Sequence, residues 1–319
     1  MNCNRTGEFA KELQALGWWY QHFEFPNGVK TGGGDPPGYD ARTRWSFIEP
    51  FVPDDLTGKT VLDVGGNAGF FSIQMKLRGA QRCVLVDPFE IAIKQAGFAA
   101  KQFGVALELI MEDAHAYCLT TEERFDYVLF LGLFYHLKYP GIVLDRLAEM
   151  TRERIFIHSH VIGHKRGPGI SKPDYKRKTD DHLLEHPGFP RLAFVEAQYN
   201  EDSTNWWIPN RTGMEAMARS AGLRIIDRPH RQILVAAPEI YFGKQVFPKL
   251  VFPRYGKPGG AVLPGPQRYD AEGWIEISEA IAQRPVKKTN FLVQTGWKWT
   301  NRLRSLCLKI RGRLLSKII

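Results

Sequence analysis

The sequence predicts an α/β fold in which a doubly wound, mostly parallel sheet of seven strands carries helices on both faces. From Thr60 to about Ala237, short runs rich in β-branched residues alternate with longer runs at helical spacing. This alternation is typical of parallel strands joined by crossover helices. A chain of 319 residues with 44% apolar content is long enough to bury a full core and still carry extensions.

Seven short apolar runs are predicted to be strands, and four amphipathic segments are predicted to be helices. The expected strands are Thr60–Val64, Arg82–Val86, Leu107–Ile110, Tyr127–Leu131, Ile155–His158, Arg224–Asp227 and Ile233–Ala237. The expected helices are Phe70–Arg78, Glu90–Phe103, Gly141–Met150 and Thr212–Ala221. Asn210 lies near the start of the last helix, and Gly222 is well placed to end it.

Composition divides the chain into four parts. Residues 1–50 form an N-terminal cap segment with many aromatic, Gly and Pro residues, and residues 51–240 form the domain that contains the sheet. Residues 241–290 are a Pro/Gly-rich arm, and residues 291–319 are a basic amphipathic helix. Within the domain, the polar insert Gly163–Asp181 is expected to be a mobile loop or lid, because loops of this length are usually functional or disordered.

The formal charge of +9 is concentrated at one end of the chain. From Ala280 to Ile319 there are ten Lys or Arg and no Asp or Glu, which leaves the first 279 residues at −1. Apolar residues at helical spacing, edged by these bases, suit an anionic membrane surface or an RNA backbone. A terminal helix docked on the core or on a second subunit is equally compatible, and the sequence does not determine the oligomeric state.

The cysteines and the apolar runs indicate the compartment. Cys3, Cys83, Cys118 and Cys307 have neither metal-ligand nor disulfide-framework spacing, so no metal site is expected and a reducing cytosol is the simplest environment. No run reaches about 18 apolar residues, and the first residues carry charges where a signal peptide would be apolar. We therefore expect a cytoplasmic protein, with peripheral contact at the inner membrane surface as an open alternative.

The stretch VLDVGGNAGFFS takes a strand that ends near Asp63 into a tight turn. Glycine lacks the Cβ that would keep a ligand away from the backbone. A dinucleotide fingerprint G-x-G-x-x-G fails here, because Asn67 and Phe70 occupy its second and third glycine positions. The pattern acid-x-G-x-G-x-G matches Asp63, Gly65 and Gly69, with Asn67 in the middle position, and asparagine tolerates left-handed backbone.

Polar residues also follow the next three predicted strands. Asp87 ends the second strand, and its two oxygens can accept hydrogen bonds from both hydroxyls of a ribose. Asp113 follows the third and can accept from an adenine amino group, while Tyr135 and His136 lie beyond the fourth. Each acid has a structural alternative, since Asp87 before Pro88 is also a turn signal and Asp113 a helix cap.

These motifs together resemble those of class I S-adenosylmethionine (SAM)-dependent methyltransferases, which have Rossmann-like folds. The stretches RTRWSFIEPFV, GLFYHLKYP and NWWIPNRTGMEAMARSAG further resemble a group related to the bacterial tRNA wobble-uridine carboxymethyltransferases, over about Arg42 to Ala237. The resemblance implies that SAM is the cofactor. It also implies that the cofactor-binding residues are Asp63, Gly65, Gly66, Asn67, Gly69, Asp87, Pro88, Asp113, Ala114 and Leu131.

By the same resemblance, Tyr135 faces the reacting carbon. The tRNA enzymes bind carboxy-SAM through a lysine of an N-terminal segment, and the corresponding stretch here, GWWYQHFEFPNG, contains none. Ordinary methyl transfer to a small-molecule or glycan-like acceptor is therefore predicted. Carboxymethyl transfer to a tRNA wobble uridine and a non-catalytic SAM-binding regulatory module are the alternatives.

Methyl transfer requires mainly alignment and exclusion of water, and a base is needed only if the acceptor must lose a proton. His136 is the predicted base, because histidine titrates near neutral pH, with a structural histidine bonded to backbone as the alternative. His158 and His160 are expected to be packing or supporting groups, with the approach of one of them to the acceptor as the alternative. A loop with Glu201, Trp206 and Trp207 either covers the acceptor or caps the core. The absence of an N-P-P-aromatic motif argues against amino-group acceptors such as adenine or glutamine.

Overall fold

The computed structural model describes residues 3–31, 40–163 and 176–239. The Pro/Gly-rich arm at 241–290 and the basic amphipathic helix at 291–319, both predicted above, lie outside these residues. No helix in the described part of the chain combines the length and apolar character needed to cross a bilayer.

Seven strands form one sheet in the order β3-β2-β1-β4-β5-β9-β8. The strands are β1 Thr60–Val64, β2 Arg82–Val86, β3 Glu108–Ile110, β4 Phe125–Leu131, β5 Thr151–His158, β8 Leu223–His230 and β9 Ile233–Pro238. Pairing is parallel from β3 through β5, and β9 runs antiparallel to both of its neighbours. The predicted seven-stranded, mostly parallel sheet is thereby confirmed, and its strand order reverses between β1 and β4, where open α/β sheets bind ligands.

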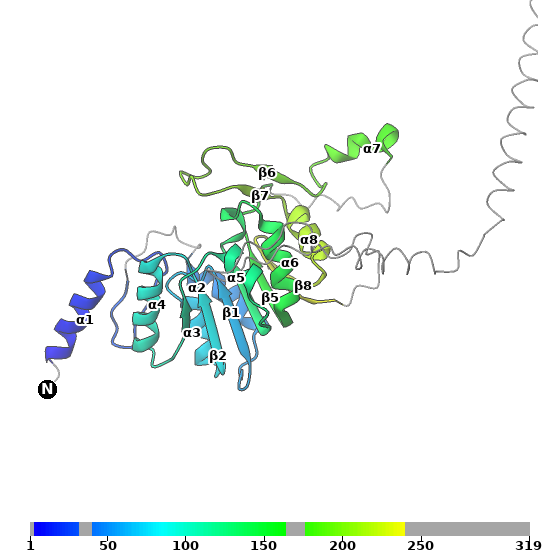
Figure 1. Cartoon of the computed structure of the whole chain (residues 1–319). Helices are drawn as coiled ribbons and strands as arrows, with labels where there is room; N and C mark the ends of the chain where they lie inside the picture. Colours follow the sequence, from blue (N-terminus) through cyan, green and yellow to red (C-terminus); the bar gives the residue numbers. More distant parts are fainter. Residues whose placement is uncertain (1–2, 32–39, 164–175, 240–319) are drawn as a thin grey trace, which may run out of the picture. The chain divides into compact units, whose positions relative to one another are not determined.

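Helices cover both faces of the sheet (Figure 1). The four predicted helices are confirmed as α3 Phe70–Leu77, α4 Glu90–Gln102, α6 Pro140–Met150 and α8 Arg211–Ser220. Alternate residues of β1 enter two separate core clusters, Val61 in the one with α3 and α4, and Leu62 in the one with α6 and α8. Because successive side chains of a strand point to opposite faces, each strand is buried on both sides.

The N-terminal segment contributes to the first of these clusters. After α1 (Cys3–Ala15), the side chains of Trp19, Phe23 and Phe25 are 1–3% exposed. The rings of Phe23 and Phe25 stack with centroids 5.6 Å apart, and Phe25 meets Phe98 of α4 edge-on at 5.7 Å. The aromatic residues expected to cap the domain are therefore part of its hydrophobic core. A second N-terminal helix, α2 (Ala41–Ile48), precedes β1.

The region between β5 and α8 differs from its prediction. The insert Gly163–Asp181 was expected to be a loop, but Arg177–Leu184 forms helix α7, and residues 164–175 lie outside the described part. The side chain of Asp180 accepts a hydrogen bond from the backbone N–H of Lys176 at 2.8 Å, which satisfies a donor at the helix start. A short antiparallel hairpin follows, formed by β6 Leu192–Phe194 and β7 Trp207–Pro209.

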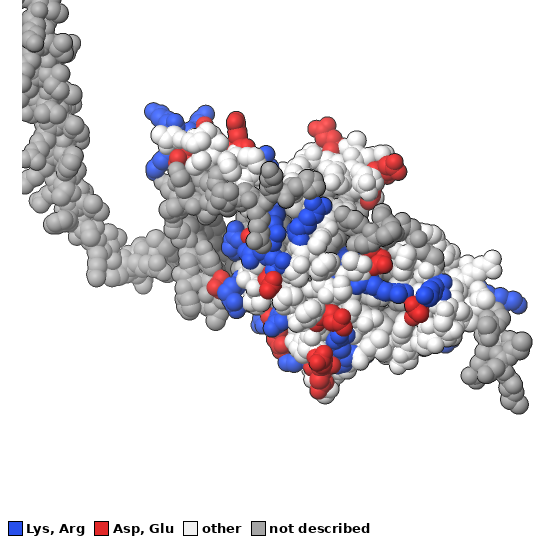
Figure 2. Space-filling view, turned by 180° about the vertical axis from the view of Figure 1, so that it is seen from behind, with Lys and Arg blue, Asp and Glu red and all other residues white. Residues whose placement is uncertain are grey.

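On the face shown in Figure 2, Lys and Arg side chains lie among Asp and Glu side chains. Glu215 on α8, for example, forms ion pairs with Arg211, Arg219 and Arg228. This mixture agrees with the near-neutral charge of the chain before its last 40 residues.

Candidate active site

The glycine turn after β1 has a left-handed backbone at three positions. Gly65, Asn67 and Gly69 have φ angles of 71°, 51° and 82°. The expectation that Asn67 tolerates such a backbone is confirmed, and its side-chain oxygen accepts from the Ala68 N–H at 2.8 Å. Gly69 is the N-cap of α3, so the turn leads directly into a helix N-terminus.

Gly66 brings the turn against the sheet. A Cβ at this position would lie 2.6 Å from Cγ of Leu85 and 3.0 Å from Cγ of Asp63. A Cβ on Gly65 would meet the Leu133 side chain at 3.0 Å, so the loop after β4 also approaches the turn. These contacts leave no room for side chains, so the turn consists of bare backbone at these positions.

Asp63 lies beneath this turn. Its carboxylate is 1% exposed and accepts from the Ser72 hydroxyl on α3 at 2.8 Å. Burial raises its pKa to about 7, the Ser72 hydrogen bond opposes this rise, and the charge of Asp87 adds to it. Asp63 therefore supports the turn from below.

Asp87 joins the end of β2 to the glycine turn. One carboxylate oxygen accepts from the Asn67 N–H at 3.0 Å, and the other accepts from the Phe89 N–H at 3.0 Å. The side chain is 4% exposed, and burial raises its pKa although both hydrogen bonds lower it. Each carboxylate oxygen has two acceptor positions, so both retain capacity for a further donor. Pro88, which follows, is exposed.

Asp113 stands at the same edge, because β3 pairs in parallel with β2. It is the N-cap of α5 (Ala114–Thr120) and accepts from the backbone N–H groups of His115 and Ala116 at 2.8 and 3.3 Å. The hydrogen bond from the His115 side chain is the main cause that lowers its pKa. Asp113 thus has the capping role that was its structural alternative, while its side chain stays 60% exposed and Ala114 is buried.

Three residues at this edge of the sheet were not among the predicted site residues. Phe89 and Met111 are 66% and 60% exposed, and they lie three residues after the end of β2 and one residue after the end of β3. Gln21, from the N-terminal segment, donates to the Gly66 carbonyl at 3.2 Å and accepts from the Phe70 N–H at 2.9 Å. Phe89 and Met111 could have been predicted, because they lie close to the strand-end acids in the sequence. Gln21 could not, because it lies 45 residues before Gly66, its hydrogen-bond partner.

The ends of β4 and β5 bring together aromatic and imidazole rings. Leu131, at the end of β4, is 6% exposed and pairs with His158 of β5. The Tyr135 ring lies 4.1 Å from that of His160 and 4.3 Å from that of His136. Burial lowers the pKa of His158 well below its usual value, and that of His160 to about 4, so both rings are neutral at pH 7.

His136 lies on a short 3-10 helix, η2 (Phe134–His136), against the loop before β7. Its Nδ1 atom is 2.8 Å from the Thr204 hydroxyl. Burial lowers its pKa, and the charge of Asp202 and the backbone of Thr204 oppose this shift. The backbone N–H of Trp206 donates to the backbone carbonyl of Tyr135 at 2.7 Å. The predicted covering loop therefore lies next to His136, the predicted base.

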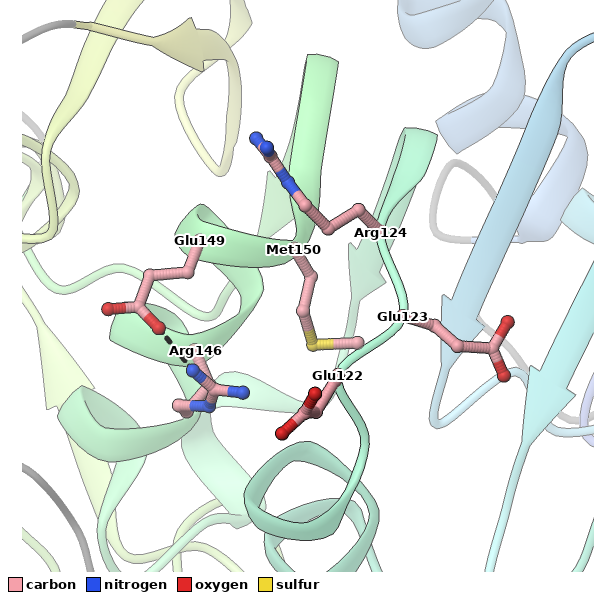
Figure 3. Close-up of a pocket in the computed structure, with 6 residues that line it drawn as sticks. All are labelled: Glu122, Glu123, Arg124, Arg146, Glu149 and Met150. Atoms are coloured by element: carbon pink, nitrogen blue, oxygen red, sulfur yellow. Dashed lines mark hydrogen bonds and ion pairs between the residues drawn. The ribbon is translucent and has the colours of Figure 1, made fainter.

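A pocket at the opposite edge of the sheet is a different feature (Figure 3). It is lined by Glu122, Glu123, Arg124, Arg146, Glu149 and Met150. These residues precede β4 or end α6, so they lie at the amino-terminal edge of the strands. Arg146 donates to the carbonyls of Cys118 and Thr121, which indicates a structural role for this group.

Comparison with known proteins identifies the family. Residues 39–227 match the family described as "Methyltransferase domain". The tRNA U34 carboxymethyltransferase of Alteromonas mediterranea is 30% identical over 34% of this chain and 34% of its own length. The enzyme of that name from Pseudomonas savastanoi pv. phaseolicola is 28% identical over 60% of this chain and 53% of its own length. The chain therefore spans between about a third and a half of these relatives.

Solved structures overlap as well. The N-terminal domain of EvdMO1 with SAH bound has a TM-score of 0.49 and 18% identity, over 72% of this chain and 94% of that one. The magnesium protoporphyrin IX methyltransferase of Synechocystis PCC 6803 has a TM-score of 0.42 and 14% identity, over 65% and 87%. Because the family match covers more than half of the sequence, the chain belongs to the methyltransferase domain family, as a class I SAM-dependent methyltransferase.

Proposed function

We propose that this protein transfers a methyl group from SAM to a small-molecule or glycan-like acceptor. The observation that carries the proposal is the link between Asp87 and the glycine turn, in which the Asn67 N–H donates to the Asp87 carboxylate at 3.0 Å. Asp87, which can accept hydrogen bonds from ribose hydroxyls, is thereby joined to the bare backbone of the glycine turn. Both lie where the strand order of the sheet reverses. When bound, SAM supplies a methyl group already activated by a positively charged sulfur.

The residues at this edge fit an adenosyl ligand. The backbone of Gly65, Gly66 and Asn67, backed by Asp63, would hold the methionine end of the cofactor, with Gly69 opening the helix beneath it. Asp87 would hold the ribose. Adenine would be held by Asp113, with apolar cover from Phe89 and Met111. The rest of the cofactor site would be lined by the other predicted residues, Pro88, Ala114 and Leu131.

Tyr135 and His136 are assigned to the acceptor side. Tyr135 orients the acceptor toward the reacting carbon, and His136 takes up the proton that an acceptor group loses. Burial lowers the pKa of His136, which favours the neutral ring that a base requires.

Aromatic side chains next to these residues support a small-molecule or glycan-like acceptor. The Lys138 ammonium lies 5.2 Å from the centroid of the Trp206 ring, and the rings of Phe194 and Trp207 are 4.8 Å apart. Phe194 is 50% exposed. Partly exposed rings with polar neighbours suit a ligand that has both apolar faces and hydroxyl groups.

Carboxymethyl transfer to tRNA is the second candidate. It is favoured by the names of the relatives, which are tRNA U34 carboxymethyltransferases. Mass spectrometry of the cofactor that co-purifies with the native chain separates the two, because carboxy-SAM carries an additional carboxyl group. Methyl turnover in an acceptor extract separates either enzyme from a non-catalytic SAM-binding module.

The proposal is tested by calorimetric titration of SAM into the Asp87→Ala variant. The variant loses the carboxylate that would hold two ribose hydroxyls, and each of these hydrogen bonds contributes about 1.5–3 kcal/mol. We therefore expect the Kd for SAM to rise by at least about 100-fold. Asp54→Ala, at an exposed site away from the turn, is the matched control and should bind normally. Unchanged affinity in a folded Asp87→Ala variant removes the ribose assignment.

A further inference from the structure

Two hydrogen bonds connect His136 to a carboxylate through one hydroxyl. The Thr204 Oγ1 atom lies 2.6 Å from Oδ1 of Asp202 and 2.8 Å from Nδ1 of His136. The backbone N–H of Thr204 also donates to Oδ1 of Asp202, at 2.8 Å. Among the described residues, none forms a hydrogen bond with the Nε2 atom of His136.

The chemistry of these groups determines the direction of both bonds. An ionised carboxylate only accepts hydrogen bonds, and burial of Asp202 is outweighed by the bonds from Thr204, so that its pKa is lowered. A hydroxyl has one proton to donate. The Thr204 proton therefore points to Asp202, because the opposite arrangement would place two acceptor oxygens 2.6 Å apart with no proton between them. The Thr204 oxygen must then accept from Nδ1–H of His136.

We propose that Thr204 and Asp202 are positioning residues that hold His136 in its Nδ1–H tautomer, with Nε2 free as the base for a hydroxyl acceptor. This inference rests on the proposed methyl transfer at the same edge of the sheet. It adds to that proposal two residues, the nitrogen that acts, and the chemical class of the acceptor group.

The loop that carries Thr204 is held rigidly. Tyr199 and Asp202 exchange backbone hydrogen bonds of 3.1 and 3.2 Å around a two-residue turn, in which Asn200 and Glu201 have φ angles of 56° and 61°. Asparagine is favoured in such a turn, but a left-handed glutamate costs on the order of 1 kcal/mol. Strain of this kind is retained where the surrounding contacts require it, and it is frequent at functional sites.

Asn205 closes this turn, and Trp206 fastens it to the helix that carries the base. Asn205 is 4% exposed, and its side-chain amide donates to the carbonyls of Tyr199 and Asp202 at 3.1 and 3.2 Å. The next residue, Trp206, donates its N–H to the Tyr135 carbonyl. Thr204 and His136 are consequently held by one continuous set of bonds, as a base with a defined orientation requires.

A hydroxyl acceptor makes use of this arrangement. As the acceptor oxygen forms its bond to the methyl carbon, the carbon–sulfur bond breaks with its electron pair left on sulfur. The proton of the oxygen passes to Nε2, and the positive charge lost by sulfur ends on the imidazolium of His136, which Asp202 stabilises through Thr204. The other titratable groups facing His136 are His160 and Tyr135, and the low pKa of His160, about 4, prevents it from competing for the proton at pH 7.

The test is nitrogen NMR of the full chain, with the His136 ring assigned from a His136→Gln variant. The two tautomers have distinct long-range couplings and nitrogen shifts, and no acceptor is needed. We expect the Nδ1–H form in the wild type, retention of that form in Thr204→Ser, and a change to the Nε2–H form in Thr204→Val. An Nε2–H ring in the folded wild type, or an unchanged ring in Thr204→Val, overturns the proposal.

The Asp202→Asn variant provides a second, independent test. It removes a charge that raises the pKa of His136, so the midpoint of its NMR titration should fall, whereas an unchanged midpoint contradicts the relay. Calorimetry with SAM keeps the two proposals distinguishable. Thr204→Val should bind SAM within about twofold of wild type, because Thr204 lies outside the predicted cofactor residues. Failure of the wild type itself to bind SAM would instead contradict the proposed function.

Discussion

At the scale of single residues, the two strand-end acids have different roles although the sequence presents them alike. Asp63 is sealed under the glycine turn with one hydroxyl partner, whereas the buried Asp87 accepts from two backbone N–H groups, those of Asn67 and Phe89. The first supports the backbone, and the second is the acid that we propose holds the ribose. Burial raises the pKa of both, so their protonation is linked to stability.

We expect Asp63→Asn to stabilise the ligand-free protein at high pH. The folded pKa of about 7 exceeds the ordinary value of 3.8, so the stability that the neutral carboxyl contributes is fully present below pH 3.8 and is lost as pH rises through 7. Denaturant unfolding at pH 8 should show the variant more stable by up to about 4 kcal/mol.

The difference in the free energy of unfolding should shrink as the pH falls to 4. Asp54→Asn, at an exposed position, should show no such trend. A stability difference for Asp63→Asn that does not change with pH would contradict the assigned pKa.

At the scale of elements, the turn between β1 and α3 packs directly against side chains of the neighbouring strand β2. Gly66 has no space for a Cβ, because Leu85 of β2 occupies it, and Gln21 closes the turn from the other side. Gly213 of α8 is confined in the same way, by the backbone of Arg191, but the other described glycines outside the turn are not. Gly97 in α4 would bring its Cβ to an ordinary contact of 3.4 Å with Leu109.

We therefore expect Gly66→Ala to destabilise the protein by about 1–3 kcal/mol through overpacking, and to weaken SAM binding in the same titration. Gly97→Ala should instead raise the free energy of unfolding by about 0.5–1 kcal/mol, because alanine is the better helix former. Equal effects at the two glycines would show that the turn is not tightly packed.

At the scale of the whole molecule, the N-terminal segment and the sheet share one core. Phe23 and Trp19 lie in the same buried cluster as residues of β1, β4 and β5. Phe23→Ala should lower the free energy of unfolding by about 3–5 kcal/mol, measured by denaturant titration. The comparable change at Trp18, which is 64% exposed, should stay within about 0.5 kcal/mol. If both variants unfold like the wild type, the segment is not integral to the core.

The charge distribution makes a separate prediction for the whole chain. Residues 285–319, outside the described part, contain nine Lys or Arg and no Asp or Glu, a charge equal to the net +9 of the whole chain. Removing them should abolish salt-dependent binding of tRNA or of anionic liposomes, whichever the full chain displays. Equal binding by the full and truncated chains would assign the partner contact to the described domain.

Much of the fold was predictable because it depends on local patterns. β1 and β2 begin and end at the predicted residues, since both are short strands, buried except at their first residue, between glycine or polar positions. β5 begins four residues earlier than predicted, because the polar stretch Thr151–Arg154 also pairs with β4, through Phe125 and Tyr127. Helix α5 was missed, because seven residues show too little periodicity and its clearest start signal, Asp113, was interpreted as a ligand group.

The sequence by itself determined the family, the sheet, the glycine turn and the acids at successive strand ends, because each depends on residues close together in the chain. Only the tertiary structure decided that Gln21 closes the turn and that Thr204 and Asp202 orient His136, 68 and 66 residues before them. Such contacts follow from strand order and loop packing, which bring distant residues within hydrogen-bonding distance and leave no periodic signal in the chain.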